Sequence, residues 1–198
     1  MKKLRDTPSQ TVGPFFAYGL TAEQYGYDFT SIADGLLVNQ DSDQIKIAIT
    51  GCVYDGNGKV IPDAMIELWQ GDSQGKYNDQ SIGKDREDFR GFGRLGTGTQ
   101  RGHKFYFTTV KPGSAEKGCA PHINVILFMR GSLLHLYTRI YFDDEAEANK
   151  KDPLLNLIPE ARRHTLIAKR VETGGTVEYN FDIHMQGERE TVFFDVKN

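Results

Sequence analysis

The sequence of 198 residues is poor in cysteine, has no long apolar run and carries no excess of positive charge. Its two cysteines, Cys52 and Cys119, are too few for a disulfide framework, so we expect two free thiols in a reducing compartment, with a single bridge as the alternative. The absence of a long apolar stretch excludes a transmembrane helix. Because 24 Lys and Arg residues face 27 Asp and Glu residues, for a net charge of −3, we expect no basic surface for nucleic acid or an anionic membrane.

The N-terminal segment also lacks two patterns. Met1 to Arg5 is basic, but the polar residues 6–10 follow where a secretory signal peptide would have its apolar run, so we expect a cytoplasmic location. Residues 1–43 show no sustained periodicity, although they contain apolar residues. We therefore predict an N-terminal arm, residues 1–43, that packs on a partner chain, with its own body as the alternative. Residues 44–198 form the predicted β domain.

What the sequence does have, from Gln44 onward, is alternation of apolar and polar residues in short runs. Ile45, Ile47 and Ile49 recur at every second position, and the glycine-rich segment Asp55–Gly58 then signals a turn. About eight such runs, with two short helices expected at 143–150 and 159–170, predict an all-β fold. The expected form is an antiparallel β-sandwich with short peripheral helices and an extended N-terminal arm.

The organising stretch is a pair of strands near the middle of the chain. Residues 122–129 and 133–142 alternate in apolar character on both faces, which is typical of strands buried between layers. Arg130-Gly131 interrupts the two runs and predicts a turn. His122 at one end of the first strand and Arg130 at the other mark the strand as a place where a β protein could build a site.

Several segments resemble the intradiol ring-cleavage dioxygenase family: Thr7–Pro14, Trp69–Tyr77, Gly93-Arg94, Thr109–Gly113 and Ala120–Ile123. Three later runs resemble the alpha chain of its two-chain members: Arg139–Ala146, Leu166–Arg170 and Gln186–Asp195. The resemblance extends from Thr7 to Asp195, except for residues 22–43 and 78–90. It implies a β-sandwich core and a heterodimer with a beta subunit that assembles further. The complex would cleave the ring of 3,4-dihydroxybenzoate with O2.

The resemblance also implies where the iron lies. The family's iron-bearing chain holds Fe(III) with two tyrosines and two histidines, and anionic phenolates suit ferric iron. Here the His-x-His pair is reduced to His122 and Asn124, the segment Ser114–Gly118 lacks the expected tyrosine, and no tyrosine occurs between Asn78 and Phe105. We therefore predict no metal ligand set in this chain, Fe(III) held by the beta subunit, and a hydrogen-bonded structural role for His122.

In such a heterodimer the alpha chain lends side chains to the mouth of the beta chain's pocket. The motif match gives Gly13, Pro14 and Phe15 of the arm and Arg130 of the turn as substrate-binding residues, with no catalytic residue in this chain. A guanidinium there suits the carboxylate of an anionic substrate. The alternatives are an arm packed on its own body and an Arg130 paired with a local acid.

Two other residues are expected to be structural. Arg139 is predicted to form an ion pair inside the sandwich, and Trp69 to lie in the core. Two other functions remain open: a non-catalytic β-sandwich binding module, and a stand-alone intradiol-like protein with an altered metal site.

Overall fold

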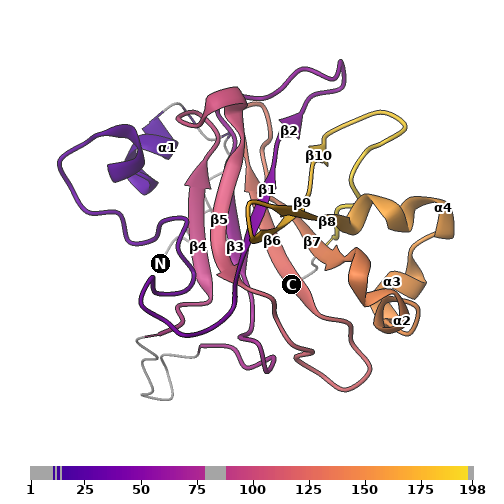
Figure 1. Ribbon diagram of the computed structural model, residues 1–198. Coiled ribbons are helices and arrows are strands. Elements are labelled where there is room, and N and C mark those ends of the chain that lie inside the picture. Colours follow the sequence, from indigo (N-terminus) through magenta and orange to yellow (C-terminus); the bar gives the residue numbers. More distant parts are fainter. Residues whose placement is uncertain (1–10, 12, 14, 79–87, 196–198) are drawn as a thin grey trace, which may run out of the picture.

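The computed structural model describes residues 11, 13, 15–78 and 88–195 (Figure 1). The strands are β1 (Lys46–Gly51), β2 (Val53–Tyr54), β3 (Met65–Trp69), β4 (Phe92–Gly96), β5 (Phe105–Val110), β6 (His122–Phe128), β7 (Leu136–Phe142), β8 (Ile167–Thr173), β9 (Thr176–Asn180) and β10 (Ile183–His184). The α-helices are α1 (Phe15–Leu20), α2 (Ala146–Asn149), α3 (Pro153–Leu157) and α4 (Glu160–Arg163). Short 3-10 turns are η1 (Glu23–Tyr25), η3 (Arg101–His103), η4 (Asp143–Glu145) and η5 (His164–Leu166).

Eight strands form one mixed sheet in the order β4-β3-β6-β7-β8-β9-β1-β5, and β10 pairs with β2 in a small second sheet. The outermost strands of the large sheet, β4 and β5, also contact each other, so the sheet is nearly barrel-like. β8 runs parallel to β7, and β1 runs parallel to β9. The prediction of an all-β fold with short helices is confirmed. The antiparallel sandwich is not confirmed, because the helices after β7 return the chain to the same end of the sheet before β8 begins.

The main core lies between the two halves of this sheet. β6 contributes Ile123, Val125 and Leu127 to it, and β1 contributes Ile47 and Ile49 from the other half. Because side chains alternate along a strand, the residues between these on β6 face the opposite, outer side of the sheet. The alternation therefore decides that His122 and Asn124 share that outer side.

The loops after β3 and β5 are joined by polar contacts that explain two of the sequence motifs. The buried amide of Gln70 donates from Nε2 to the carbonyl of Val110 at 2.9 Å and accepts from the hydroxyl of Thr109 at 3.0 Å. Gly75 has φ +80° and approaches Ser114 so closely that a Cβ would lie 2.1 Å from its carbonyl oxygen. A glycine is required at such a position.

The predicted strand pair in the middle of the chain is confirmed as β6 and β7. The helix predicted at 159–170 is wrong in its second half, where β8 begins at Ile167 and pairs with both β7 and β9. The apolar and polar residues of 191–195 also alternate, but they form only one bridge, between Tyr137 and Phe194. Both cysteines are free, as expected.

Residues 34–37 form backbone hydrogen bonds with β4 and β5, and Leu37 is fully buried in the main core. Figure 1 shows α1 beside β4, whereas α2, α3 and α4 gather on the side of β7 and β8. Among the described residues, no helix is long and apolar enough to cross a bilayer.

Candidate functional site

The outer face of β6 and β7 carries His122, the only one of the four iron ligands of the family's iron-bearing chain that this sequence retains. The register places His122 opposite Tyr141 and Asn124 opposite Arg139. All four side chains lie on the same side of the sheet, because they alternate with core residues. We call these four residues the outer-face cluster.

His122 is 7% exposed and is held by its own strand end. Its Nδ1 lies 2.8 Å from the carbonyl oxygen of Ala120, which can only accept, so Nδ1 carries the proton and Nε2 keeps the lone pair. Burial, followed by the charge of Arg139, lowers the pKa of His122, so the imidazole is neutral at pH 7. The predicted hydrogen-bonded state of His122 is confirmed.

Asn124 joins the cluster to two aromatic side chains, Tyr77 in the loop after β3 and Trp69 at the end of β3. Its Oδ1 accepts from Nε of Arg139 at 3.0 Å, and its Nδ2 donates to the hydroxyl of Tyr77 at 3.1 Å. The ring of Tyr77 in turn lies 4.5 Å from that of Trp69. A chain of contacts therefore runs from a guanidinium to a surface tryptophan.

Two predictions about this face are wrong. Trp69 is 50% exposed and not a core residue, because it ends β3 on the outer face. Arg139 makes no ion pair with any carboxylate among the described residues, and it interacts with neutral groups, the amide of Asn124 and the phenol of Tyr141. Sequence spacing could not reveal this pair, because the two residues meet only through the register of β6 and β7.

Asp152 closes the buried end of the cluster and was missed by sequence reasoning. Its carboxylate is fully buried, accepts from the backbone N–H groups of Ala120 and Leu155 at 2.9 Å each, and accepts from the Tyr141 hydroxyl at 3.2 Å. Burial raises the pKa of Tyr141 to about 12, which keeps its phenol protonated. The signal was present, since an Asp followed by Pro153 is a typical helix N-terminus.

The donor set of this face does not fit a ferric ion. It offers one neutral imidazole, an amide already bonded at both ends, a protonated phenol and a guanidinium, whereas ferric iron prefers anionic oxygen ligands. Within the described part of the chain, no group of three or more His, Cys, Asp or Glu residues is arranged to hold a metal ion.

One of the predicted substrate-binding residues, Arg130, lies just beyond the other end of β6. Arg130 is 60% exposed and forms a hydrogen-bonded ion pair with Asp63. The next residue, Gly131, donates its N–H to the hydroxyl of Thr11 at 2.8 Å, so the N-terminal arm reaches the turn that carries Arg130. Of the predicted arm residues, Gly13 is exposed, Phe15 begins α1, and Pro14 lies outside the described residues.

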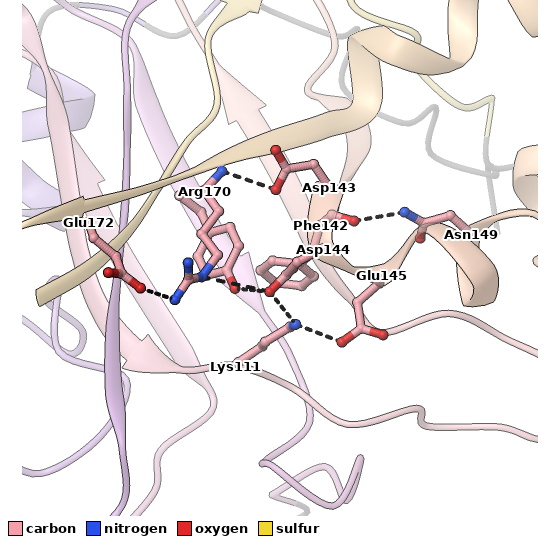
Figure 2. Close-up of polar contacts among 9 residues, drawn as sticks. Lys111, Phe142, Asp143, Asp144, Glu145, Asn149, Arg170 and Glu172 are labelled. Atoms are coloured by element: carbon pink, nitrogen blue, oxygen red, sulfur yellow. Dashed lines mark hydrogen bonds and ion pairs between the residues drawn. The ribbon is translucent and has the colours of Figure 1, made fainter.

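A second polar region surrounds Lys111 at the end of β5 (Figure 2). Its ammonium lies 2.9 Å from the carboxylate of Asp144 and 2.6 Å from that of Glu145, both on η4. Arg170 on β8 lies 3.9 Å from Asp144 and also pairs with Glu172. We call these five residues the Lys111 cluster. Three of them, Lys111, Asp144 and Arg170, border a pocket of about 430 Å³ that Ile45, Ile47, Val110 and Val177 also line.

Charges in the Lys111 cluster compensate one another. Burial alone would lower the pKa of Lys111, but hydrogen bonds to Glu145 and Asp144 outweigh it and raise that pKa. Burial alone would likewise raise the pKa of Asp144, but hydrogen bonds from Lys111 and Tyr179 hold it below its usual range. Because three carboxylates surround two cations, the cluster presents no net positive charge to an anionic ligand, and we interpret it as a connection between β5, η4 and β8.

The fold and the sequence together place the chain in a class. The family model described as Dioxygenase matches residues 20–187. The dioxygenase domain of a dioxygenase carbohydrate-binding protein fusion from Streptomyces sp. SirexAA-E has the same fold, with a TM-score of 0.59, 21% identity and coverage of 94% of this chain and 100% of that one. The chain belongs to the intradiol dioxygenase family.

Within this family, the chain is similar to particular subunits. It is 50% identical to the protocatechuate 3,4-dioxygenase alpha chain of Burkholderia cepacia, over 99% of this chain and 100% of that one. The alpha chain of Pseudomonas putida is 46% identical over 97% of both chains. The beta chain of the Burkholderia cepacia enzyme is less similar, at 31% identity over 74% of this chain and 66% of that one.

Proposed function

We propose that this chain is the alpha subunit of a protocatechuate 3,4-dioxygenase. The complex cleaves 3,4-dihydroxybenzoate between its two hydroxyl-bearing carbons, incorporates both atoms of O2 and yields 3-carboxy-cis,cis-muconate, a step of aromatic catabolism by the beta-ketoadipate route. The observation that carries the proposal is the 50% identity to an alpha chain over nearly the whole length of both proteins. The similarity to a beta chain is lower and covers less of each chain.

The proposal assigns the Fe(III) to a beta subunit and leaves this chain free of iron. The outer-face cluster supports this assignment, because an amide stands two residues after the retained His122 and a guanidinium lies opposite that amide. The ferric ion would bind and activate the catecholate substrate within the beta subunit. This chain would form a cytoplasmic heterodimer with it, which oligomerises further.

The contribution of this chain to substrate binding is assigned to Gly13, Pro14, Phe15 and Arg130. The hydrogen bond between Thr11 and Gly131 supports a common location, because it brings the arm to the turn. In this proposal Gly13, Pro14 and Phe15 belong to the arm, residues 1–43, and Arg130 belongs to the β domain, residues 44–198.

The proposal is tested by reconstitution with a beta subunit encoded beside this chain. The chain alone should contain no stoichiometric ferric iron and should not turn over protocatechuate, whereas the co-expressed pair should contain iron and be active. A chain that alone holds about one tightly bound ferric ion would contradict the assignment and favour a stand-alone protein. A chain that forms no complex with the beta subunit would favour a binding module.

Arg130→Ala tests the substrate role within the complex. Removing a charge-assisted contact to the substrate carboxylate should cost on the order of 1–2 kcal/mol and raise the KM for protocatechuate roughly five- to thirty-fold. Turnover of catechol, which lacks the carboxylate, should change much less. Steady-state kinetics with both substrates measure the contrast.

Asp63→Asn is the matched control, because it removes the charge that Arg130 pairs with in the structure. It should leave the KM for protocatechuate unchanged or lower. If both variants leave the KM unchanged and lower the stability of the complex equally, Arg130 has a structural role only.

A further inference from the structure

Position 124, where the His-x-His pair of the family's iron-bearing chain would have its second histidine, is bonded to a permanent positive charge. Arg139 lies directly opposite Asn124 on β7, and its Nε donates to the amide oxygen at 3.0 Å. A guanidinium stays protonated in proteins at any ordinary pH. The cation is therefore fixed at the tip of the side chain where a second imidazole would have to be.

This charge is not neutralised by a neighbouring acid in the described part of the chain. The buried carboxylate of Asp152 accepts from two backbone N–H groups and from the Tyr141 hydroxyl instead. Lys111 and Arg170, by contrast, each contact carboxylates. Arg139 thus has no ion-pair partner on the outer face among the described residues.

A metal ion held by positions 122 and 124 would meet this charge. Residues two apart on a strand lie on the same face, so an ion between their side chains would be within a few ångströms of the guanidinium. Like charges at such a distance repel strongly in a half-buried environment.

We propose that Arg139 closes this face to metal ions, and that the exchange of histidine for asparagine at position 124 is not by itself what prevents metal binding. The inference rests on the proposed function, in which this chain carries no iron. The guanidinium of Arg139 is then the positive charge of the cluster in place of a metal ion. Its hydrogen bond orients Asn124, and Asn124 in turn orients Tyr77.

The chain has one tryptophan, and its position makes the proposal measurable. Trp69 is paired with Asn124 in the sheet register and contacts Tyr77. A paramagnetic ion such as Co²⁺ bound beside position 124 would quench its fluorescence. Ions bound by exposed histidines elsewhere would quench it far less.

The experiment titrates Co²⁺ into the full-length wild-type chain and three variants, Asn124→His, Asn124→His/Arg139→Gln and Asn124→His/Arg139→Lys, with Trp69 fluorescence and calorimetry as readouts. The single variant and the lysine variant should bind Co²⁺ within about threefold of the wild type, because both keep a cation at position 139. Asn124→His/Arg139→Gln should bind Co²⁺ at least roughly tenfold more tightly than the wild type, because two imidazoles then face the ion without a neighbouring charge. The bound Co²⁺ should quench the fluorescence of Trp69.

Arg139→Gln alone controls for the loss of charge, and Asn57→His/Arg139→Gln controls for an added imidazole at an exposed turn. Neither should gain the tenfold increase. Thermal unfolding checks that each variant folds, and Arg139→Met replaces the glutamine variant if that one does not fold. Equal Co²⁺ affinity of Asn124→His and the glutamine variant would overturn the proposal, as would a lysine variant that binds as tightly as the glutamine variant. Failure of this proposal can be told apart from failure of the proposed function, which fails only if the wild-type chain itself carries ferric iron or forms no active complex.

Discussion

The outer-face cluster and the Lys111 cluster each place a cation among polar groups, but only the Lys111 cluster pairs its cation with carboxylates. Lys111 contacts two carboxylates, and its ammonium also lies 5.5 Å from the ring centre of Phe142. Arg139 contacts a neutral amide and finds no carboxylate among the described residues. A compensated cation stabilises the connection between elements, whereas a half-buried cation without an acid adds little stability. Local violations of this kind are typical of functional positions.

The largest effect on stability is expected for a substitution of Asp152. Its carboxylate accepts hydrogen bonds from backbone groups and makes no ion pair with Arg139. Asp152→Ala removes acceptors from two buried N–H groups and from the Tyr141 hydroxyl. The free energy of unfolding should fall by about 3 kcal/mol or more, because hydrogen bonds to a charged acceptor and a helix N-cap are lost together. Urea denaturation measures the change.

Asp152→Asn is the control, since it keeps the shape and one acceptor oxygen. It should cost clearly less than the alanine variant. A cost below about 1 kcal/mol for Asp152→Ala would mean that the loop before β6 holds its conformation without this carboxylate.

A smaller effect is expected in the Lys111 cluster. Lys111→Met leaves Asp144 and Glu145 without their shared cation and should lower the free energy of unfolding by about 1–2 kcal/mol. Lys150→Met, which breaks an exposed pair with Glu147, should cost less than about 0.5 kcal/mol. If the two lysine variants lost equal stability, the ion pairs of Lys111 would contribute no more to the free energy of unfolding than an exposed surface pair.

The stability difference between wild type and Lys111→Met should also depend on pH. Because the pKa of Asp144 is held below its ordinary value of 3.8, the folded state takes up this proton less readily than the unfolded state. The contribution of Asp144 is therefore complete well above pH 3.8 and is lost as the pH falls through the lowered pKa. Urea denaturation of both proteins at a series of pH values should show the difference shrinking in acid. A difference that stays constant down to pH 2 would contradict the assignment.

The smallest effect is expected for Arg139→Gln. One hydrogen bond is lost, but so is an uncompensated half-buried charge, so the free energy of unfolding should change by less than about 1 kcal/mol. The fluorescence of Trp69 should shift because Tyr77 loses the orientation that Asn124 provides. A loss of stability larger than that of Lys111→Met would contradict this expectation. It would show that Arg139 stabilises the fold more than the ion-paired Lys111 does.

Much of the sheet could be predicted because alternation is a local signal. The strands β6 and β7, the turn at Arg130-Gly131 and the turn after β2 follow from residues adjacent in the chain. The start of β8 could not be predicted this way, because residues 159–170 include good helix formers and pairing with β7 and β9 decides in favour of a strand at Ile167.

The sequence by itself determined that position 124 holds an asparagine, that the expected tyrosines are absent and that two thiols remain. Only the tertiary structure decided that Arg139 meets this asparagine, that Trp69 faces outward and that Asp152 lies beneath Tyr141. The physical reason is register: which residues face each other across two strands depends on the pairing of whole strands, and a shift by one residue would move every side chain to the other face.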